Sequence, residues 1–172
     1  NIFEIYHNLV VYGDYEVYYK KNGSFALLND IECQKDYSIG LAKFDLSKYR
    51  DDLSLYSEDE DTFIIVFYNK NLKNKNILGS SNAMSMQVIP CGHEDIYYKK
   101  FNLIVGYKNN GKELFDEWQK VETFISSNKY DKHYILNIGS NKVFFGDHIS
   151  GKIPPKGKDN IKFWSLVLTK GK

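Results

Sequence analysis

The residue types best able to do chemistry gather in one stretch, Cys91-Gly92-His93-Glu94-Asp95. A cysteine near a histidine could supply a nucleophile and the base that activates it. Neighbouring residues on an extended strand point to opposite faces, however, and no third group that would orient the base can be identified. We therefore interpret the stretch as a loop with a structural cysteine and predict no catalytic residue. A hydrolase that uses Cys91 and His93 is the enzymatic alternative.

Metal-ligand and phosphate-binding patterns are missing from the sequence. The other histidines, His7, His133 and His148, are scattered, and no two histidines are four residues apart. The chain has no Cys-x-x-Cys pair, no phosphate-binding glycine loop and no Gly-x-Ser-x-Gly motif. The acidic run Ser57–Asp61 lacks the alternating ligands and the glycine of an EF-hand loop. We predict no metal site and no cofactor.

Length and charge narrow the class of protein. The chain has 172 residues, which fits one domain, and its 23 basic and 22 acidic residues give a net charge of +1. Such a balance creates no field that would attract nucleic acid or anionic lipid. Arg50 is the only arginine, and arginine is the usual reader of guanine and phosphate. We predict no nucleic-acid partner, and no apolar run is long enough for a membrane span in this segment.

The elements that would position a site are predicted to be short strands. Aromatic residues make up 16% of the chain, and aromatic and β-branched residues favour strands. His133–Asp147 contains two short apolar runs around the turn residues Gly139-Ser140-Asn141. This pattern predicts a central β-hairpin, around which the rest of the chain is arranged.

The N-terminal part carries a second hairpin signal. Asn22-Gly23 is the strongest short turn signal in the chain, and it joins Tyr15–Lys21 to Ser24–Leu28. Ile2–Tyr12, which is also apolar and aromatic, precedes these two segments. We predict an antiparallel meander of three strands here.

Other segments differ in period and composition. Asp45–Tyr56 has helical spacing, and Asp45 could cap a short helix. Thr62–Tyr68 is apolar on both faces, which is typical of a central strand. Lys112–Ile125 fits either a helix or a strand. His148–Asn160 is predicted to be a long loop, because Pro154-Pro155 cannot pair regularly, and Ile161–Thr169 a closing strand.

Many short strands with turn signals about every ten residues predict an all-β fold. We expect an antiparallel β-sandwich with at most one or two short helices. The expected organisation is a single domain over residues 1–172. It comprises an N-terminal meander over 1–44, a short helix and acidic loop over 45–61, and the main sandwich over 62–172.

Exposed aromatic residues are the sequence's best indication of a binding site. Tyr107 and Trp118 flank a turn that contains Asn109 and Asn110. Aromatic rings beside amides suit sugars or protein surfaces, because the ring face packs while polar edges donate and accept hydrogen bonds. We predict that these four residues bind a protein or glycan ligand. The alternative is that both rings lie in the core.

Two cysteines and the first residue bear on the compartment. Cys33 and Cys91 could form a disulfide, which would imply an oxidising compartment, or remain two buried thiols. Asn22-Gly23-Ser24 is a glycosylation sequon, although the same residues make a good turn. The chain starts at Asn1 rather than at methionine, so we expect a processed segment from which any signal peptide or anchor is missing.

The order of strands from Thr62 onward resembles a known family. The matching pieces are TFIIVFY, FNLIVGYKNNGK, HYILNIGSNKVFFG and IKFWSLVL. This order is similar to the domain named after farnesoic acid O-methyltransferase, which occurs in many extracellular proteins of animals and protists. The resemblance implies a lectin-like β module that binds rather than reacts. An immunoglobulin-like protease inhibitor of the chagasin type is also all-β with a similar closing strand.

These observations lead to one functional hypothesis and one alternative. The first is a non-catalytic binding or adhesion domain of a secreted or cell-surface protein, with a protein or a glycan as its ligand. The alternative is a secreted protease inhibitor that acts through its loops, with His148–Asn160 as the candidate loop.

Overall fold

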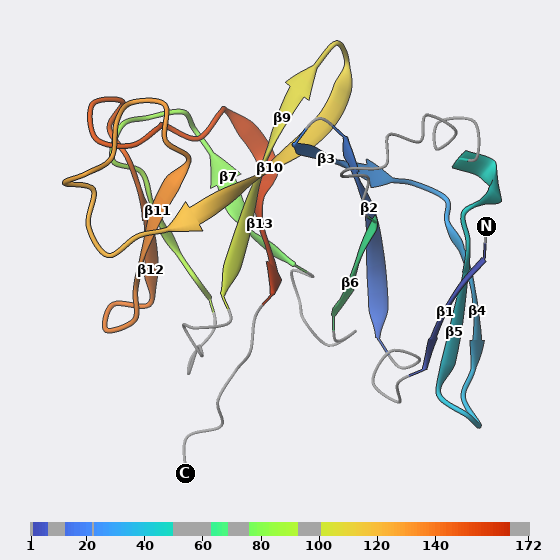
Figure 1. Cartoon of the computed structure of the whole chain (residues 1–172). Coiled ribbons are helices and arrows are strands. Elements are labelled where there is room, and N and C mark those ends of the chain that lie inside the picture. The colour runs from blue at the N-terminus through green and yellow to red at the C-terminus, as the bar shows by residue number, and fades with distance from the viewer. Residues whose placement is uncertain are drawn as a thin grey trace. The chain divides into compact units, whose positions relative to one another are not determined.

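The computed structural model describes residues 2–6, 13–21, 23–49, 63–68, 76–92 and 101–165, and the statements below concern these residues. Strands dominate them, and most strand pairs are antiparallel (Figure 1). The predicted all-β sandwich class is therefore confirmed. The chain divides into two compact units, Asn1–Lys75 and Asn76–Lys172, and each is described by itself. A single domain over residues 1–172 stays a prediction.

Unit 1 contains two sets of antiparallel strands. In the first set, β5 lies between β1 and β4. In the second set, β2 pairs with β3 on one side and with β6 on the other. The bounds are Ile2–Tyr6 for β1, Asp14–Lys21 for β2, Ser24–Leu28 for β3, Glu32–Asp36 for β4, Leu41–Asp45 for β5 and Phe63–Tyr68 for β6.

The two sets share one hydrophobic core. Val17 of β2 is buried together with Ala42 and Phe44 of β5. The rings of Tyr15 and Phe44 meet edge to face, with centroids 5.0 Å apart. The Tyr15 hydroxyl donates a hydrogen bond of 2.8 Å to the carbonyl of Ile31. Unit 1 is therefore a small sandwich whose two layers pack through these side chains.

Two expectations for unit 1 are corrected. The turn at Gly23 joins β2 and β3 as predicted, but β1 pairs with β5 and is no third strand of that meander. Pairing with β5 places Ile5 against the core cluster. Within the described residues β6 pairs with β2 alone, so β6 is an edge strand and β2 the central one.

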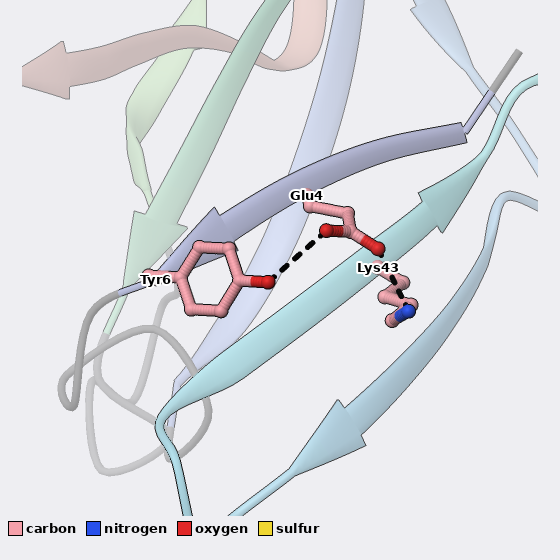
Figure 2. Close-up of polar contacts among 3 residues, drawn as sticks. All are labelled: Glu4, Tyr6 and Lys43. Carbon is pink, nitrogen blue, oxygen red and sulfur yellow. Dashed lines mark hydrogen bonds and ion pairs between the residues drawn. The ribbon is translucent and has the colours of Figure 1, made fainter.

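The outer face of β1 and β5 carries polar side chains in a row. Lys43 Nζ lies 2.7 Å from Glu4 Oε1, and the Tyr6 hydroxyl donates to Glu4 Oε2 at 3.1 Å (Figure 2). Glu4 and Lys43 are directly opposite each other in the β1–β5 ladder. The hydrogen bond from Lys43, followed by that from Tyr6, lowers the pKa of Glu4. These contacts are exposed to solvent, so they favour the register rather than add much stability.

The predicted helix at Asp45–Tyr56 is only partly described. The Asp45 carboxylate accepts a hydrogen bond of 2.8 Å from the amide of Ser47, while its role as the cap of a helix stays a prediction. A single 3-10 turn follows at Ser47–Tyr49. Residues 50–62, which include the rest of that helix and the acidic run, lie outside the described residues. The sequon asparagine, Asn22, also lies outside them.

Unit 2 contains two sheets, which are connected through β10. The β9 sheet has the order β7-β13-β9-β10, and the β12 sheet has the order β8-β12-β11. At its end β10 pairs with β11 in a parallel ladder. The bounds are Ile77–Ser81 for β7, Val88–Pro90 for β8, Asn102–Asn109 for β9, Lys112–Lys120 for β10, His133–Asn137 for β11, Lys142–Phe145 for β12 and Gly157–Ser165 for β13.

The core of unit 2 lies between these two sheets. Trp118 of β10 meets Phe145 of β12 edge to face, with ring centroids 5.3 Å apart. The ring of Phe101 packs on Tyr134 of β11 at 6.0 Å, and the Tyr134 hydroxyl donates to the carbonyl of Phe101 at 3.0 Å. Side chains of both sheets thus interdigitate as in a sandwich. The central hairpin predicted at His133–Asp147 is present as β11 and β12.

Two further segments of unit 2 refine the sequence interpretation. The ambiguous Lys112–Ile125 is a strand as far as Lys120 and irregular beyond it. The long loop predicted at His148–Asn160 ends earlier, because β13 begins at Gly157. The Asn160 side chain explains the difference. Its Nδ2 donates hydrogen bonds to the carbonyls of Gly106 and Pro155, and its Oδ1 accepts one from the amide of Ser81. These bonds anchor a segment in which the prolines have no backbone N–H group to donate.

Candidate functional site

The β12 sheet is apolar on both of its faces. Ile89 and Val143 are paired on the face that belongs to the core. On the other face Val88, Phe144 and Ile135 lie opposite one another across β8, β12 and β11. Sheet faces of this kind are normally covered. Here the cover is incomplete, because Val88 remains 42% exposed.

A cleft of about 430 Å³ lies over this apolar row. Its walls come from the sheet and from the loops at 82–87, 121–132 and 146–156. Its size is in the range of ligand-binding pockets. Most of the lining is apolar. The lining residues are Met86, Val88, Phe124, Ile135, Phe144, Phe145, Gly146, Asp147 and Ser150.

Backbone hydrogen bonds hold the three loops together. The amide of Met86 donates to the carbonyl of Gly146 at 3.1 Å, which ties the first loop to the third. The amide of Gly151 donates to the carbonyl of Asn128 at 3.1 Å, and that of Lys152 to the carbonyl of Asp131 at 2.8 Å. The three loops that form the walls of the cleft are therefore fixed to one another through the backbone.

One wall depends on two glycines. A Cβ atom on Gly146 would lie 2.3 Å from the backbone of Gly151, which is closer than any real contact. A Cβ atom on Gly151, whose φ is +91°, would lie 3.2 Å from the ring of Phe124. Only glycine allows the chain to fold back so tightly. This close approach brings Phe124 and the 146–151 turn to the edge of the cleft.

Asp147 is the charged residue of the lining. Its Oδ1 accepts hydrogen bonds from the amides of Ser150 at 2.7 Å and Ile149 at 2.8 Å. These backbone hydrogen bonds, Ser150 first, lower the pKa of Asp147. The carboxylate is therefore ionised at neutral pH and also shapes the turn that carries it.

Apolar side chains extend from the cleft to its rim. Met86, which lines the cleft, is 70% exposed, and Ile149 in the 146–151 turn is 78% exposed. Met84 of the 82–87 loop and Ile125 of the 121–132 loop are exposed as well, but neither lines the cleft. An exposed apolar residue that continues an apolar cleft, such as Met86, favours the use of that cleft for binding.

The four residues predicted to bind a ligand are not brought together. Trp118 is only 3% exposed and packs in the core, so it is not available to a ligand. Tyr107 is half-buried on β9, opposite Leu114. Asn109 and Asn110 are exposed at the β9–β10 turn. None of the four lines the cleft.

Both cysteines are free thiols. Cys91 is buried, and Cys33 is half-buried. Burial raises the pKa of Cys91 to about 11 and also raises the pKa of Cys33. Cys91 is therefore a protonated, poorly nucleophilic thiol at neutral pH. His93, its proposed base, lies outside the described residues.

A serine and a histidine meet near the cleft. Ser127 Oγ lies 2.8 Å from His133 Nδ1. In a catalytic triad a carboxylate would orient the imidazole. The nearby Asp131 carboxylate instead accepts from the amide and the side chain of Asn128. The Ser127–His133 contact therefore fastens the 121–132 loop to β11.

Metal ligands and membrane-spanning helices are not found in the described part of the chain. No group of three or more His, Cys, Asp or Glu side chains there is placed to hold a metal ion. None of its helical segments has the length and apolar character to cross a membrane.

Comparison with known proteins gives no relative from which to transfer a function. No protein-family model matches the chain, no curated protein matches it, and no solved structure matches it. The similarity to the farnesoic acid O-methyltransferase-like domain therefore stays a prediction.

The sequence does indicate the cleft, but the pattern of any single strand is not enough to recognise it. The runs HYIL and VFF place apolar residues on both faces of two short, adjacent strands. A hairpin that is apolar on both faces must be covered on both faces by other parts of the protein or by a ligand. The missing information was the register with β8, which aligns Val88 with Phe144 and Ile135.

Proposed function

We propose that this chain is a non-catalytic binding or adhesion module of a secreted or cell-surface protein, and that the unit 2 cleft receives an apolar side chain of a protein ligand. The observation that supports this proposal is the apolar row on the outer face of the β12 sheet, left partly open under a cleft with fixed walls. Filling the cleft would remove Val88 and Met86 from water and stabilise the complex.

The lining favours a protein ligand over a glycan. Sugars are usually held by several convergent polar groups beside an aromatic ring. In this cleft the polar side chains are those of Asp147 and Ser150, and the remaining lining residues are apolar. A side chain such as leucine or phenylalanine fits this chemistry better than a sugar ring.

A peptide selection tests the proposal. A displayed library of random peptides is selected on the full chain, and the enriched peptides are titrated against Val88→Asp. We expect enriched peptides with apolar residues, and a loss of affinity of at least about tenfold in the variant, because the ligand's apolar group would then be buried beside an unpaired carboxylate.

The matched control is Ile39→Asp, since Ile39 is 57% exposed in the β4–β5 turn of unit 1. This variant should bind the peptides as the wild type does. The proposal is wrong if no peptide is enriched, or if Val88→Asp and Ile39→Asp bind the enriched peptides with the same affinity. A glycan array decides the other ligand class: a glycan whose binding depends on Val88 would replace the peptide.

A protease inhibitor is the second candidate, because one observation favours it. Ile149 projects from a turn that three hydrogen bonds hold: two to Asp147 Oδ1, and one of 3.0 Å from the amide of His148 to the carbonyl of Gly151. A rigid loop with an exposed apolar side chain could enter a protease cleft. Papain-like and serine proteases are assayed with wild type, Ile149→Ala and the control Ile125→Ala. Inhibition lost only in Ile149→Ala favours this candidate, and no inhibition removes it.

A further inference from the structure

The cleft carries one unbalanced charge. Both hydrogen bonds that shape the 146–151 turn go to Asp147 Oδ1. Asp147 Oδ2 has no hydrogen-bond partner or ion pair within the described residues, so this oxygen is available to a ligand. The carboxylate is accessible to solvent, so its attraction for a cation is modest and should weaken as the salt concentration rises.

The lysines of the neighbouring loop have other partners. Lys132 Nζ forms an ion pair of 2.8 Å with Asp116 Oδ2, outside the cleft lining. Lys129 Nζ lies over the ring of Tyr130, 5.0 Å from its centroid. Neither therefore neutralises Asp147 in this structure. The adjacent His148 also lowers the pKa of Asp147, but within the described residues it forms no ion pair with the carboxylate, so a cation of the ligand can still bind Oδ2.

We propose that the cleft recognises a protein segment in which an apolar side chain stands beside a lysine or arginine. The apolar group packs over Val88, Phe144 and Ile135, while the ammonium or guanidinium group binds Asp147 Oδ2. This inference rests on the proposed function and narrows its ligand. The apolar row by itself would bind many apolar side chains with similar affinity. The charge of Asp147 would favour those ligands that also carry a cation.

Two small probes separate the cation from the apolar group. Phenethylamine and phenethyl alcohol share the same ring and linker, and they differ in carrying an ammonium or a hydroxyl group. Their binding is followed by NMR of the two methionine methyl groups, assigned with Met84→Leu. Met86 lines the cleft and Met84 does not, although both lie in the same loop, so Met84 is an internal control.

We expect both probes to shift the Met86 signal saturably while Met84 moves little. At low salt and pH 7.5 the amine should bind about threefold more tightly than the alcohol. Asp147→Asn keeps a side-chain oxygen that can accept from the Ile149 and Ser150 amides but removes the charge. In this variant the two probes should bind equally.

The outcomes distinguish the two proposals. Equal affinity of both probes for the wild type, with a saturable Met86 shift, overturns the cation preference and leaves the apolar cleft standing. No saturable shift with either probe overturns both. If Asp147→Asn does not fold, the wild type at about 1 M salt decides, because screening should abolish the amine's advantage. An advantage that persists there contradicts the inference.

Discussion

At the scale of single residues, Trp118 has a structural role that can be measured. Its ring is buried against Phe145 in the core of unit 2. We expect Trp118→Ala to lower the free energy of unfolding by about 3–5 kcal/mol, because it leaves a large cavity. Urea denaturation measures the loss, with the exposed Ile125→Ala as control. Equal stability of the two variants would show that Trp118 is not a core residue.

Cys91 gives a second prediction at this scale. Its buried thiol has a pKa of about 11, so little thiolate is present at neutral pH. Under native conditions at pH 7.5, iodoacetamide should modify Cys91 much more slowly than the half-buried Cys33, and denaturant should make the two equal. Mass spectrometry of the labelled peptides gives both rates. Rapid native labelling of Cys91 would indicate an activated thiol and reopen the hydrolase alternative.

Single residues also show which structural features a local sequence pattern can predict and which it cannot. Asp45 accepts a hydrogen bond from the amide two residues on, and a bond of this kind can be expected from the sequence because it depends only on neighbours along the chain. Tyr107 and Trp118 lie on the same face of β9 and β10, as the register shows. Whether that face is exposed depends on Phe145, which comes from another sheet. The sequence could not predict that covering, and so Trp118 was assigned to a ligand.

At the scale of elements, the turn after β12 is held by a close backbone approach. Gly146→Ala should lower the melting temperature by several degrees, because the added methyl group overlaps the backbone of Gly151 and pushes the turn away. The control is Gly139→Ala, where the nearest atom is 3.6 Å from the new methyl group. Thermal unfolding compares them. An unchanged melting temperature for Gly146→Ala would contradict the packing of this wall.

Asp147 makes the same turn sensitive to acid. Its pKa is lowered in the folded chain, so its stabilising effect is fully present above the ordinary value of 3.8 and is lost as the pH falls through the lower, folded value. The Ile149 and Ser150 amide signals should therefore move in an NMR titration whose midpoint lies below pH 3.8. Asp147→Asn should remove the transition. A transition at pH 5 or above would contradict the lowered pKa.

Elements were predictable where their partners are close in sequence. The β2–β3 and β11–β12 hairpins follow from tight turns with glycine or asparagine at the required positions. The partner of β1 is β5, more than thirty residues away, and local alternation cannot encode that pairing. The parallel pairing of the end of β10 with β11 is not encoded locally either. It forms because β10 continues beyond the end of its antiparallel ladder with β9.

At the scale of the whole molecule, each unit has its own core. One core cluster is drawn from unit 1 and the other from unit 2, and the cleft is built from unit 2 residues. The all-β class followed from composition and turn spacing. The division into two units did not, because both halves are equally rich in short strands. The cleft depends on three strands and three loops, so it becomes visible only in the folded chain.

Photo-crosslinking with a selected peptide tests most directly whether the cleft is the binding site. Photo-methionine replaces both methionines of the chain, Met84 and Met86, and thus places reactive groups inside and just outside the cleft. The complex is irradiated, and the crosslinked residue is mapped by mass spectrometry. Our account predicts that the peptide is attached at Met86 and little at Met84. A peptide that binds the chain but is attached at Met84 alone, or at neither position, would contradict it.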